Sequence, residues 1–109
     1  MSHFALSPAA QEDLDAIWDY TADRWSPRQA DKYVLGIRDA CRQLVLKTRR
    51  SEVLDEVRAG YRKSTIGSHI IFFRTPDTGV IDVVRILHSR MDHRANLDDD
   101  ERSLPDLLN

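Results

Sequence analysis

Two apolar runs on either side of a turn decide the fold of this chain. They read HIIFFR (residues 69–74) and VIDVVRIL (residues 80–87), and TPDTG (residues 75–79) joins them. Both runs are rich in β-branched and aromatic residues and are too short for helices, and the turn has proline at its second position and glycine at its end. The pattern predicts an antiparallel β-hairpin.

Two further short segments have the character of strands. Tyr61–Ser64 precedes the first run, separated from it by Gly67, and is predicted to be a third strand. Phe4–Leu6 is predicted to be a fourth strand, at an edge of the sheet. Residues 48–60 mix charges with a few apolar side chains and end in Ala59-Gly60, which is typical of a loop or linker.

The N-terminal half carries helical signals instead. Ser7-Pro8 is typical of a helix start, because serine caps free N–H groups and proline gives up a donor that had no partner. Ser26-Pro27 repeats this signal, and Gln29 completes a capping box. Apolar residues recur at helical spacing after both starts. The pattern predicts helices over residues 8–24 and from Pro27 to about residue 47.

These elements define an α+β architecture of order β-α-α-β-β-β. Because only one or two residues separate the helices, they must fold back as an antiparallel hairpin. The antiparallel sheet is then expected to pack one face against this N-terminal helical hairpin. The apolar stripes of the helices place Trp18, Trp25 and Cys41 in the core.

Length and composition fit one small domain. The chain has 109 residues, of which 41% are hydrophobic and 31% charged, enough for one core and too few for two. No apolar run approaches the roughly 18 residues of a membrane span, and the N-terminus has no basic region followed by an apolar stretch. We therefore expect a cytoplasmic protein without membrane contact. A single cysteine excludes an intramolecular disulfide framework.

The formal charge of −2 hides an uneven distribution. Residues 1–57 carry 8 basic and 10 acidic side chains, residues 58–97 carry 7 and 3, and residues 98–109 carry 1 and 5. The division predicts a single domain over residues 1–97 followed by an acidic C-terminal tail, 98–109. Such a tail is either solvated or folds back on the basic segment, anchored by its leucines.

Basic side chains of the second half are the candidate binding residues. A cation within an apolar strand needs either solvent at its tip or an anionic partner. With residues 76–79 as the loop, Arg74 lies opposite Ile81 and shares a face with Arg85, unless a bulge breaks the alternation. The candidates are these basic residues together with one aromatic residue: Arg62, Lys63, Phe72, Arg74, Arg85, His88, Arg90 and Arg94.

Signatures of enzymes and metal sites are missing from the sequence. It has no glycine-rich phosphate loop, nucleophile elbow, HExxH pair or EF-hand loop. His88, Asp92 and His93 lie close together but lack a further obvious ligand, so we expect neither a metal nor a cofactor. Three interpretations of the basic cluster stay open: RNA cleavage with His88 as acid or base, a docking surface for an acidic partner, and a solvated face.

Motifs in both halves of the chain carry a family resemblance. They are LSPAAQEDLDAIWDY (residues 6–20), RAGYRK (residues 58–63), GSHIIFFR (residues 67–74) and IDVVRILH (residues 81–88), with Arg24-Trp25, Gln29-Ala30 and Tyr33 between them. In this order they resemble the ParE branch of the RelE/ParE toxin superfamily, over residues 4 to 97. The acidic tail departs from the pattern, because many relatives lack such an extension.

The resemblance implies the toxin of a type II toxin–antitoxin system. A toxin of this branch inhibits DNA gyrase by binding, without catalytic residues of its own, and a ParD-like antitoxin neutralises it. DNA is contacted only indirectly, through the antitoxin. The eight candidate residues would then bind the antitoxin or the target. The alternative is a RelE-like ribonuclease that cleaves mRNA in the ribosome, for which Lys63, Arg74, Arg85 and His88 are the matching residues, although no tyrosine follows Tyr61.

Overall fold

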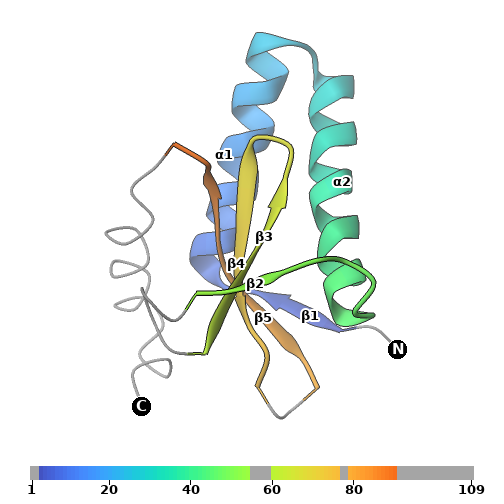
Figure 1. Ribbon diagram of the computed structural model, residues 1–109. Coiled ribbons are helices and arrows are strands. Elements are labelled where there is room, and N and C mark those ends of the chain that lie inside the picture. The colour runs from blue at the N-terminus through green and yellow to red at the C-terminus, as the bar shows by residue number, and fades with distance from the viewer. Residues whose placement is uncertain (1–2, 55–59, 77–78, 91–109) are drawn as a thin grey trace.

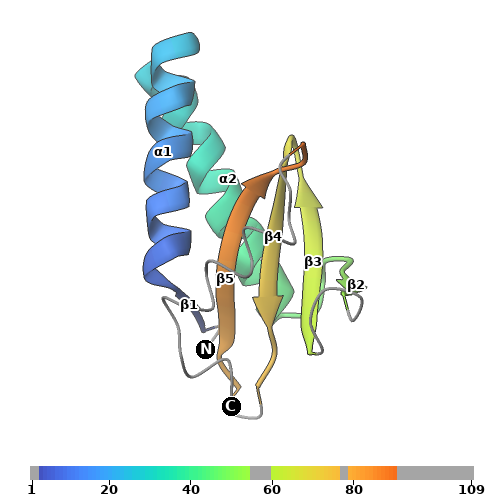
Figure 2. The ribbon, with the colours of Figure 1, turned by 90° about the vertical axis from the view of Figure 1, so that its left-hand side faces the viewer.

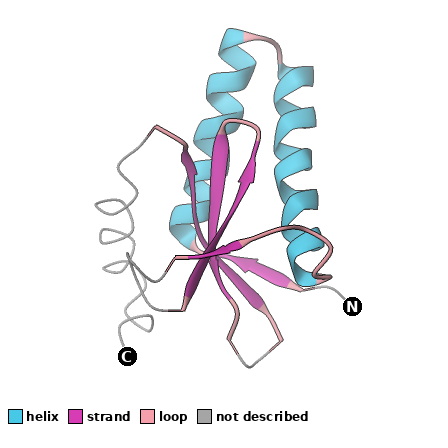
Figure 3. Cartoon of the chain, viewed as in Figure 1, coloured by secondary structure: helices cyan, strands magenta, loops and turns pink. Residues whose placement is uncertain are grey.

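A pair of antiparallel helices lies against one face of a five-stranded sheet (Figures 1 and 2). The computed structural model describes residues 3–54, 60–76 and 79–90. Its elements follow the order β1 (Phe4–Leu6), α1 (Pro8–Arg24), α2 (Pro27–Val45), β2 (Glu52–Val53), β3 (Tyr61–Ile66), β4 (His69–Arg74) and β5 (Ile81–His88). Figure 3 shows the same division into helical and strand layers. The predicted α+β class is confirmed.

Both helices begin where their capping residues predict. The Ser7 Oγ accepts a hydrogen bond from the backbone N–H of Ala10 at 2.9 Å, and the Ser26 Oγ accepts one from Gln29 at 3.1 Å. Each serine thereby satisfies an N–H that has no partner within its helix. The bounds of α1 are those predicted, whereas α2 ends at Val45, about two residues early.

The strands lie in the order β1-β5-β4-β3-β2. The predicted hairpin of β4 and β5 is confirmed, and β3 pairs antiparallel with β4. A tight turn at Gly67 and Ser68 joins β3 to β4, and Gly67 has a φ of 55°. A Cβ at this position would lie 2.7 Å from the Tyr33 hydroxyl, so both the backbone conformation and the available space favour glycine.

The sheet is mixed, and the prediction of a wholly antiparallel sheet is wrong in this respect. β1 pairs with β5 in parallel, with Phe4 opposite Ile81 and Leu6 opposite Val83. Two helices and three further strands, rather than a hairpin turn, connect β1 to β5 along the chain. Residue alternation in the sequence carries no information on the direction of a strand. β2 was not predicted because both of its residues, Glu52 and Val53, are exposed and show no alternation.

The register of β4 and β5 also differs from the prediction. Arg74 lies opposite Asp82 rather than Ile81, and Arg85 lies opposite Phe72. Val84 is the extra residue of a bulge, because Phe72 pairs with Arg85 while Phe73 pairs with Val83. The bulge breaks the alternation along β5. Arg74 pairs with Asp82 and Tyr61 and lies on the face away from the helices, whereas the Arg85 side chain reaches Asp13 of α1.

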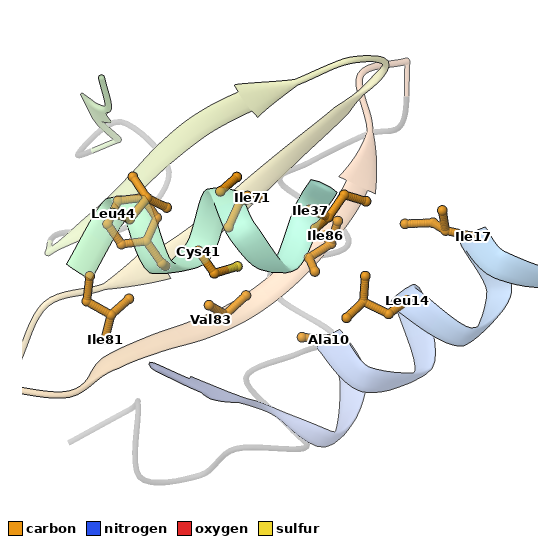
Figure 4. Close-up of a cluster of buried hydrophobic side chains, with 12 residues drawn as sticks. Ala10, Leu14, Ile17, Ile37, Cys41, Leu44, Ile71, Ile81, Val83 and Ile86 are labelled. Carbon is orange, nitrogen blue, oxygen red and sulfur yellow. The ribbon is translucent and has the colours of Figure 1, made fainter. Parts of the chain in front are cut away.

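The main core lies between the helices and the sheet (Figure 4). Its buried side chains include Leu14 of α1, Ile37 and Cys41 of α2, and Phe73 of β4. Burial raises the pKa of the Cys41 thiol to about 11 against an ordinary 9.0, opposed by the nearby Arg38, Arg49 and Arg42. The predicted core position of this cysteine is therefore confirmed, and its thiol stays protonated at neutral pH.

The far end of the helical hairpin projects past the β3–β4 turn (Figure 2). Trp25 lies at this tip between the two helices and is 71% exposed, so its predicted core position is wrong. Trp18 is half-buried, and its indole N–H donates to Asp31 of α2 at 2.8 Å. Helical spacing sets the side of a helix on which a residue lies, but burial also requires that the sheet extend beneath it.

A second group of buried apolar residues lies on the opposite face of the sheet. It comprises Tyr61, Ile70, Phe72, Val84 and Leu87, with Leu54 packed against them. Directly paired residues of an antiparallel sheet share a face. Lys63, which pairs with Phe72, and Arg74, which pairs with Tyr61, therefore belong to this outer face.

Candidate functional site

A groove of about 620 Å³ opens between the C-terminal end of α2 and the adjoining ends of β3, β4 and β5. We call it the cationic groove. Its rim carries Lys47, Arg49 and Arg62, and its floor is apolar, formed by Leu44, Val45, Phe73 and Ile81. None of the described residues that line it is acidic. The groove therefore combines a positive rim with an apolar floor.

Neutral groups hold Arg49 in place. Its Nε donates to the Ser64 Oγ at 3.2 Å, its Nη1 to the Gln43 Oε1 at 2.8 Å, and its Nη2 to the Thr65 carbonyl at 2.9 Å. Ser64 is itself buried and donates to the Arg50 carbonyl at 2.8 Å. These contacts tie the segment after α2 to β3, and they fix the guanidinium plane without neutralising its charge.

Arg62 has the same kind of support. It pairs with Phe73 across the sheet, which places it on the helix side. Its Nε donates to the Ser51 Oγ at 3.0 Å and its Nη2 to the Ser51 carbonyl at 3.3 Å. Within the described ranges, neither Arg49 nor Arg62 forms an ion pair with a carboxylate. Two fixed guanidinium groups thus present net positive charge to the groove.

The positive surface continues around the edge of the sheet. A smaller hollow of about 210 Å³ shares Arg49 and Ser51 with the cationic groove and adds Arg50, Lys63 and one acidic residue, Glu52. β2 is short and pairs with β3 only at Arg62 and Lys63. Cations of the helix side and of the outer face therefore lie close together at this edge of the sheet.

The opposite end of the sheet carries two histidines. His69 and His88 pair across β4 and β5 with their rings 5.4 Å apart and nearly perpendicular. The Tyr33 hydroxyl lies 2.7 Å from the His69 Nδ1 and accepts from the Ser68 N–H at 3.2 Å. The His88 Nδ1 accepts from the Arg90 N–H at 3.1 Å. Tyr33 of α2 thereby fastens the β3–β4 turn to the helices.

Burial lowers the pKa of His69 below its ordinary 6.5; His88 lowers it further and Asp13 opposes both. Below pH 6.5 the unfolded chain therefore takes up a proton that folded His69 resists. We expect the free energy of unfolding to decrease as the pH falls through this range, and less so in His69→Gln. Urea unfolding at neutral and mildly acidic pH measures the difference. His3→Gln, at an exposed position, is the control; an unchanged pH dependence in His69→Gln would contradict the expectation.

Arg85 is committed to a contact within the fold. Its Nε and Nη2 donate to the Asp13 carboxylate at 2.8 and 2.9 Å, and the Ile86 N–H donates to the same group at 2.9 Å. Both charged side chains are 14% exposed. This bidentate pair anchors α1 to β5 and neutralises Arg85.

The candidate residues predicted from the sequence are dispersed. Arg62 lies on the rim of the cationic groove and Lys63 beside it on the outer face, while Arg74 lies opposite Asp82. Phe72 is fully buried in the outer-face cluster. His88 is half-buried near His69, Arg90 is exposed, and Arg94 lies outside the described residues. Among the candidates that the structure describes, Arg62 alone lines the cationic groove, and Lys63 lines the adjoining hollow.

Sequence reasoning missed Lys47 and Arg49, two of the three rim cations. Both lie between α2 and β2, where the pattern predicts only a loop or linker. The available signal was the charge of this segment, with Lys47, Arg49 and Arg50 within four positions. Their convergence with Arg62 depends on the turn after α2, in which Lys47 takes the left-handed conformation at φ 61°.

Two further observations concern the described ranges 3–54, 60–76 and 79–90. They contain no group of three or more His, Cys, Asp or Glu side chains placed to hold a metal ion. They also contain no helix that is both long and apolar enough to span a membrane. Asp92 and His93 of the considered metal cluster lie outside these ranges.

Comparisons with known proteins give one consistent family. Residues 4–93 match the model of the "ParE toxin of type II toxin-antitoxin system, parDE". The chain is 47% identical over 96 residues to Toxin ParE1 of Mycobacterium tuberculosis, covering 88% of this chain and 98% of the relative. It is 35% identical over 98 residues to Toxin ParE1 of Caulobacter vibrioides, covering 89% and 99%.

A solved structure agrees with the sequence relatives. A chain of the chromosomal ParDE TA system from P. aeruginosa superposes with a TM-score of 0.67 at 27% identity, covering 81% of this chain and 96% of that one. The family model, the sequence relatives and the solved structure all point to the same family. The chain belongs to the ParE toxin family of type II toxin–antitoxin systems.

Proposed function

We propose that this ParE-family toxin inhibits DNA gyrase by binding it, and that a ParD-like antitoxin neutralises it. The site of action is then the cytoplasm, where gyrase works on the chromosome, and DNA is contacted only through the antitoxin. The family membership and the ParDE assembly of the structural relative support the toxin–antitoxin part.

The dispersal of the basic residues favours binding over RNA cleavage. A nuclease would need Lys63, Arg74, Arg85 and His88 around one phosphate, because general acid–base catalysis requires groups within hydrogen-bonding reach of the reacting atoms. Arg85 is neutralised by Asp13, and Lys63 lies on the outer face of the sheet. His88 lies at the other end of the sheet on the helix side, paired with His69. This separation is the observation that carries the proposal.

Induction of the toxin in bacteria tests the proposal. We expect loss of gyrase supercoiling and accumulation of DNA breaks while translation continues. Addition of the purified toxin to a gyrase supercoiling reaction should reproduce the inhibition, and prior addition of the ParD-like antitoxin should prevent it. Early translation arrest with mRNA cut in the ribosomal A site would instead support the RelE-like alternative.

His88→Gln separates the two mechanisms further. If His88 were a catalytic acid or base, its loss would lower activity by at least about 100-fold. For a binding inhibitor we expect a small change, similar to that of the control His3→Gln, whose position is exposed. A loss of toxicity by orders of magnitude in His88→Gln alone, with unchanged folding, would contradict the proposed mechanism.

A further inference from the structure

We infer that the cationic groove receives a segment of the antitoxin in which carboxylates flank a large apolar side chain. This inference rests on the proposed function for the existence of the antitoxin. It adds the surface of the toxin and the chemistry of the partner segment. The groove lies at the C-terminal end of α2, away from His69 and His88.

The charge of the rim selects an acidic partner. Arg49 and Arg62 are held by serine, glutamine and carbonyl oxygens, and Lys47 is exposed beside them. Partly buried guanidinium groups that have no carboxylate partner among the described residues favour an incoming anion and repel a basic segment. A carboxylate-bearing segment is complementary to this rim, and the attraction also accelerates its encounter with the toxin.

The floor selects an apolar side chain between the carboxylates. Leu44, Val45, Phe73 and Ile81 form it, and its volume of about 620 Å³ is in the range of sites that enclose side chains and ligands of similar size. A phosphate backbone would use the rim but leave this floor without a partner. An acidic peptide with an apolar anchor uses both parts, which is why we favour a protein segment over a nucleic acid.

The site is also prepared before the partner arrives. The side-chain hydrogen bonds of Arg49 and Arg62 already fix both guanidinium groups. Binding therefore does not have to order these long side chains, a cost that usually weakens surface ion pairs. The entropy loss falls mainly on the incoming segment.

Short peptides that tile the ParD-like antitoxin are the probe. Binding of each fluorescently labelled peptide to the full-length toxin is measured by anisotropy at low and high salt. We expect one acidic peptide with a large apolar residue to bind, and to weaken as salt rises. Lys47→Glu should weaken it about 10-fold, because a repulsion replaces an attraction at the rim of the groove. Arg62→Gln should weaken it in the same direction.

Lys32→Glu is the matched control, because it makes the same charge change at an exposed position of α2 that does not line the groove. We expect less than a 2-fold change in this variant. Circular dichroism melting verifies that all variants fold. Equal affinities for the Lys47→Glu and Lys32→Glu variants would overturn the inference while leaving the proposed function intact. Failure of the complete antitoxin to bind the unaltered toxin would contradict the proposed function itself.

The toxin's own residues 98–109 carry related chemistry, with five acidic side chains and three leucines. A photo-crosslinker at Val45 distinguishes this occupant from the antitoxin. Labelling of the antitoxin peptide from Val45, and not from a crosslinker at the exposed Leu35, supports the inference. Labelling of residues 98–109 in the presence of saturating antitoxin would overturn it.

Discussion

Replacing Asp13 by alanine is expected to lower the free energy of unfolding by about 3 to 5 kcal/mol. The Asp13 carboxylate accepts two hydrogen bonds from Arg85 and one from the Ile86 N–H, all between 2.8 and 2.9 Å. Its loss leaves a largely buried guanidinium without its carboxylate and frees a backbone donor at the edge of β5. Equilibrium urea unfolding measures the change.

Asp15→Ala is the control for this prediction. Asp15 lies two residues farther along α1 but is exposed, and its one hydrogen-bond donor among the described residues is Gln11 of the same helix. Its replacement should change the free energy of unfolding by no more than about 0.5 kcal/mol. Adding Arg85→Ala to the Asp13 variant should recover part of the loss, because the charge that has lost its Asp13 partner is then also removed. Equal effects of Asp13→Ala and Asp15→Ala would show that the ion pair does not stabilise the fold.

Replacing Ile37 by alanine is expected to cost about 2 to 5 kcal/mol of stability. Ile37 is fully buried in the main core between α2 and the sheet. Truncation removes favourable burial and leaves a cavity that the surrounding side chains fill only in part. Because a domain of this size is stabilised by roughly 5 to 15 kcal/mol, the loss is a large fraction of the total.

Leu35→Ala provides the comparison within the same helix. Leu35 is 61% exposed, so its truncation removes little buried surface and leaves no cavity. Both variants should keep the denaturant dependence of the unaltered protein, and only Ile37→Ala should shift the midpoint strongly. A shift of the same size in Leu35→Ala would contradict this expectation, because it would show that the exposed face of the helical hairpin stabilises the fold as much as the core does.

Much of the fold could be predicted from local signals. Ser7 and Ser26 cap helices where the sequence places them, and the β4 and β5 runs form the predicted hairpin. These features depend on neighbouring residues, through capping hydrogen bonds, helical spacing and turn chemistry. The agreement at these positions follows from the short range of the interactions.

The errors concern interactions between distant segments. The parallel direction of β1 depends on β5, more than 70 residues away, and the exposure of Trp25 depends on where the sheet stops. Arg74 pairs with Asp82 rather than Ile81, an offset of one residue that places Arg74 on the face away from the helices, while Arg85 pairs with Asp13 of α1. The alternation of apolar and polar residues predicts the strands, but it does not predict this one-residue offset in their pairing.

The candidate site was predicted only in part. Arg62 and Lys63 were predicted as strand cations that need solvent or an anionic partner, but Lys47 and Arg49 lie in a segment without periodicity. Their role depends on hydrogen bonds from Arg49 to residues of β3 that lie 15 and 16 positions away in the sequence. A count of charges identifies a basic half of the chain, and only folding decides which charges face one groove.

The sequence by itself determined the helices, the hairpin strands, the class of the fold and the family, because these depend on local patterns and on motifs spread along the chain. The tertiary structure alone decided which cations are available. It neutralises Arg85 with Asp13, separates Arg74 and Lys63 from the helix side, and gathers Lys47, Arg49 and Arg62 around an apolar floor. The physical reason is that a charge acts through its neighbours in space, and those neighbours come from segments that the sequence keeps apart.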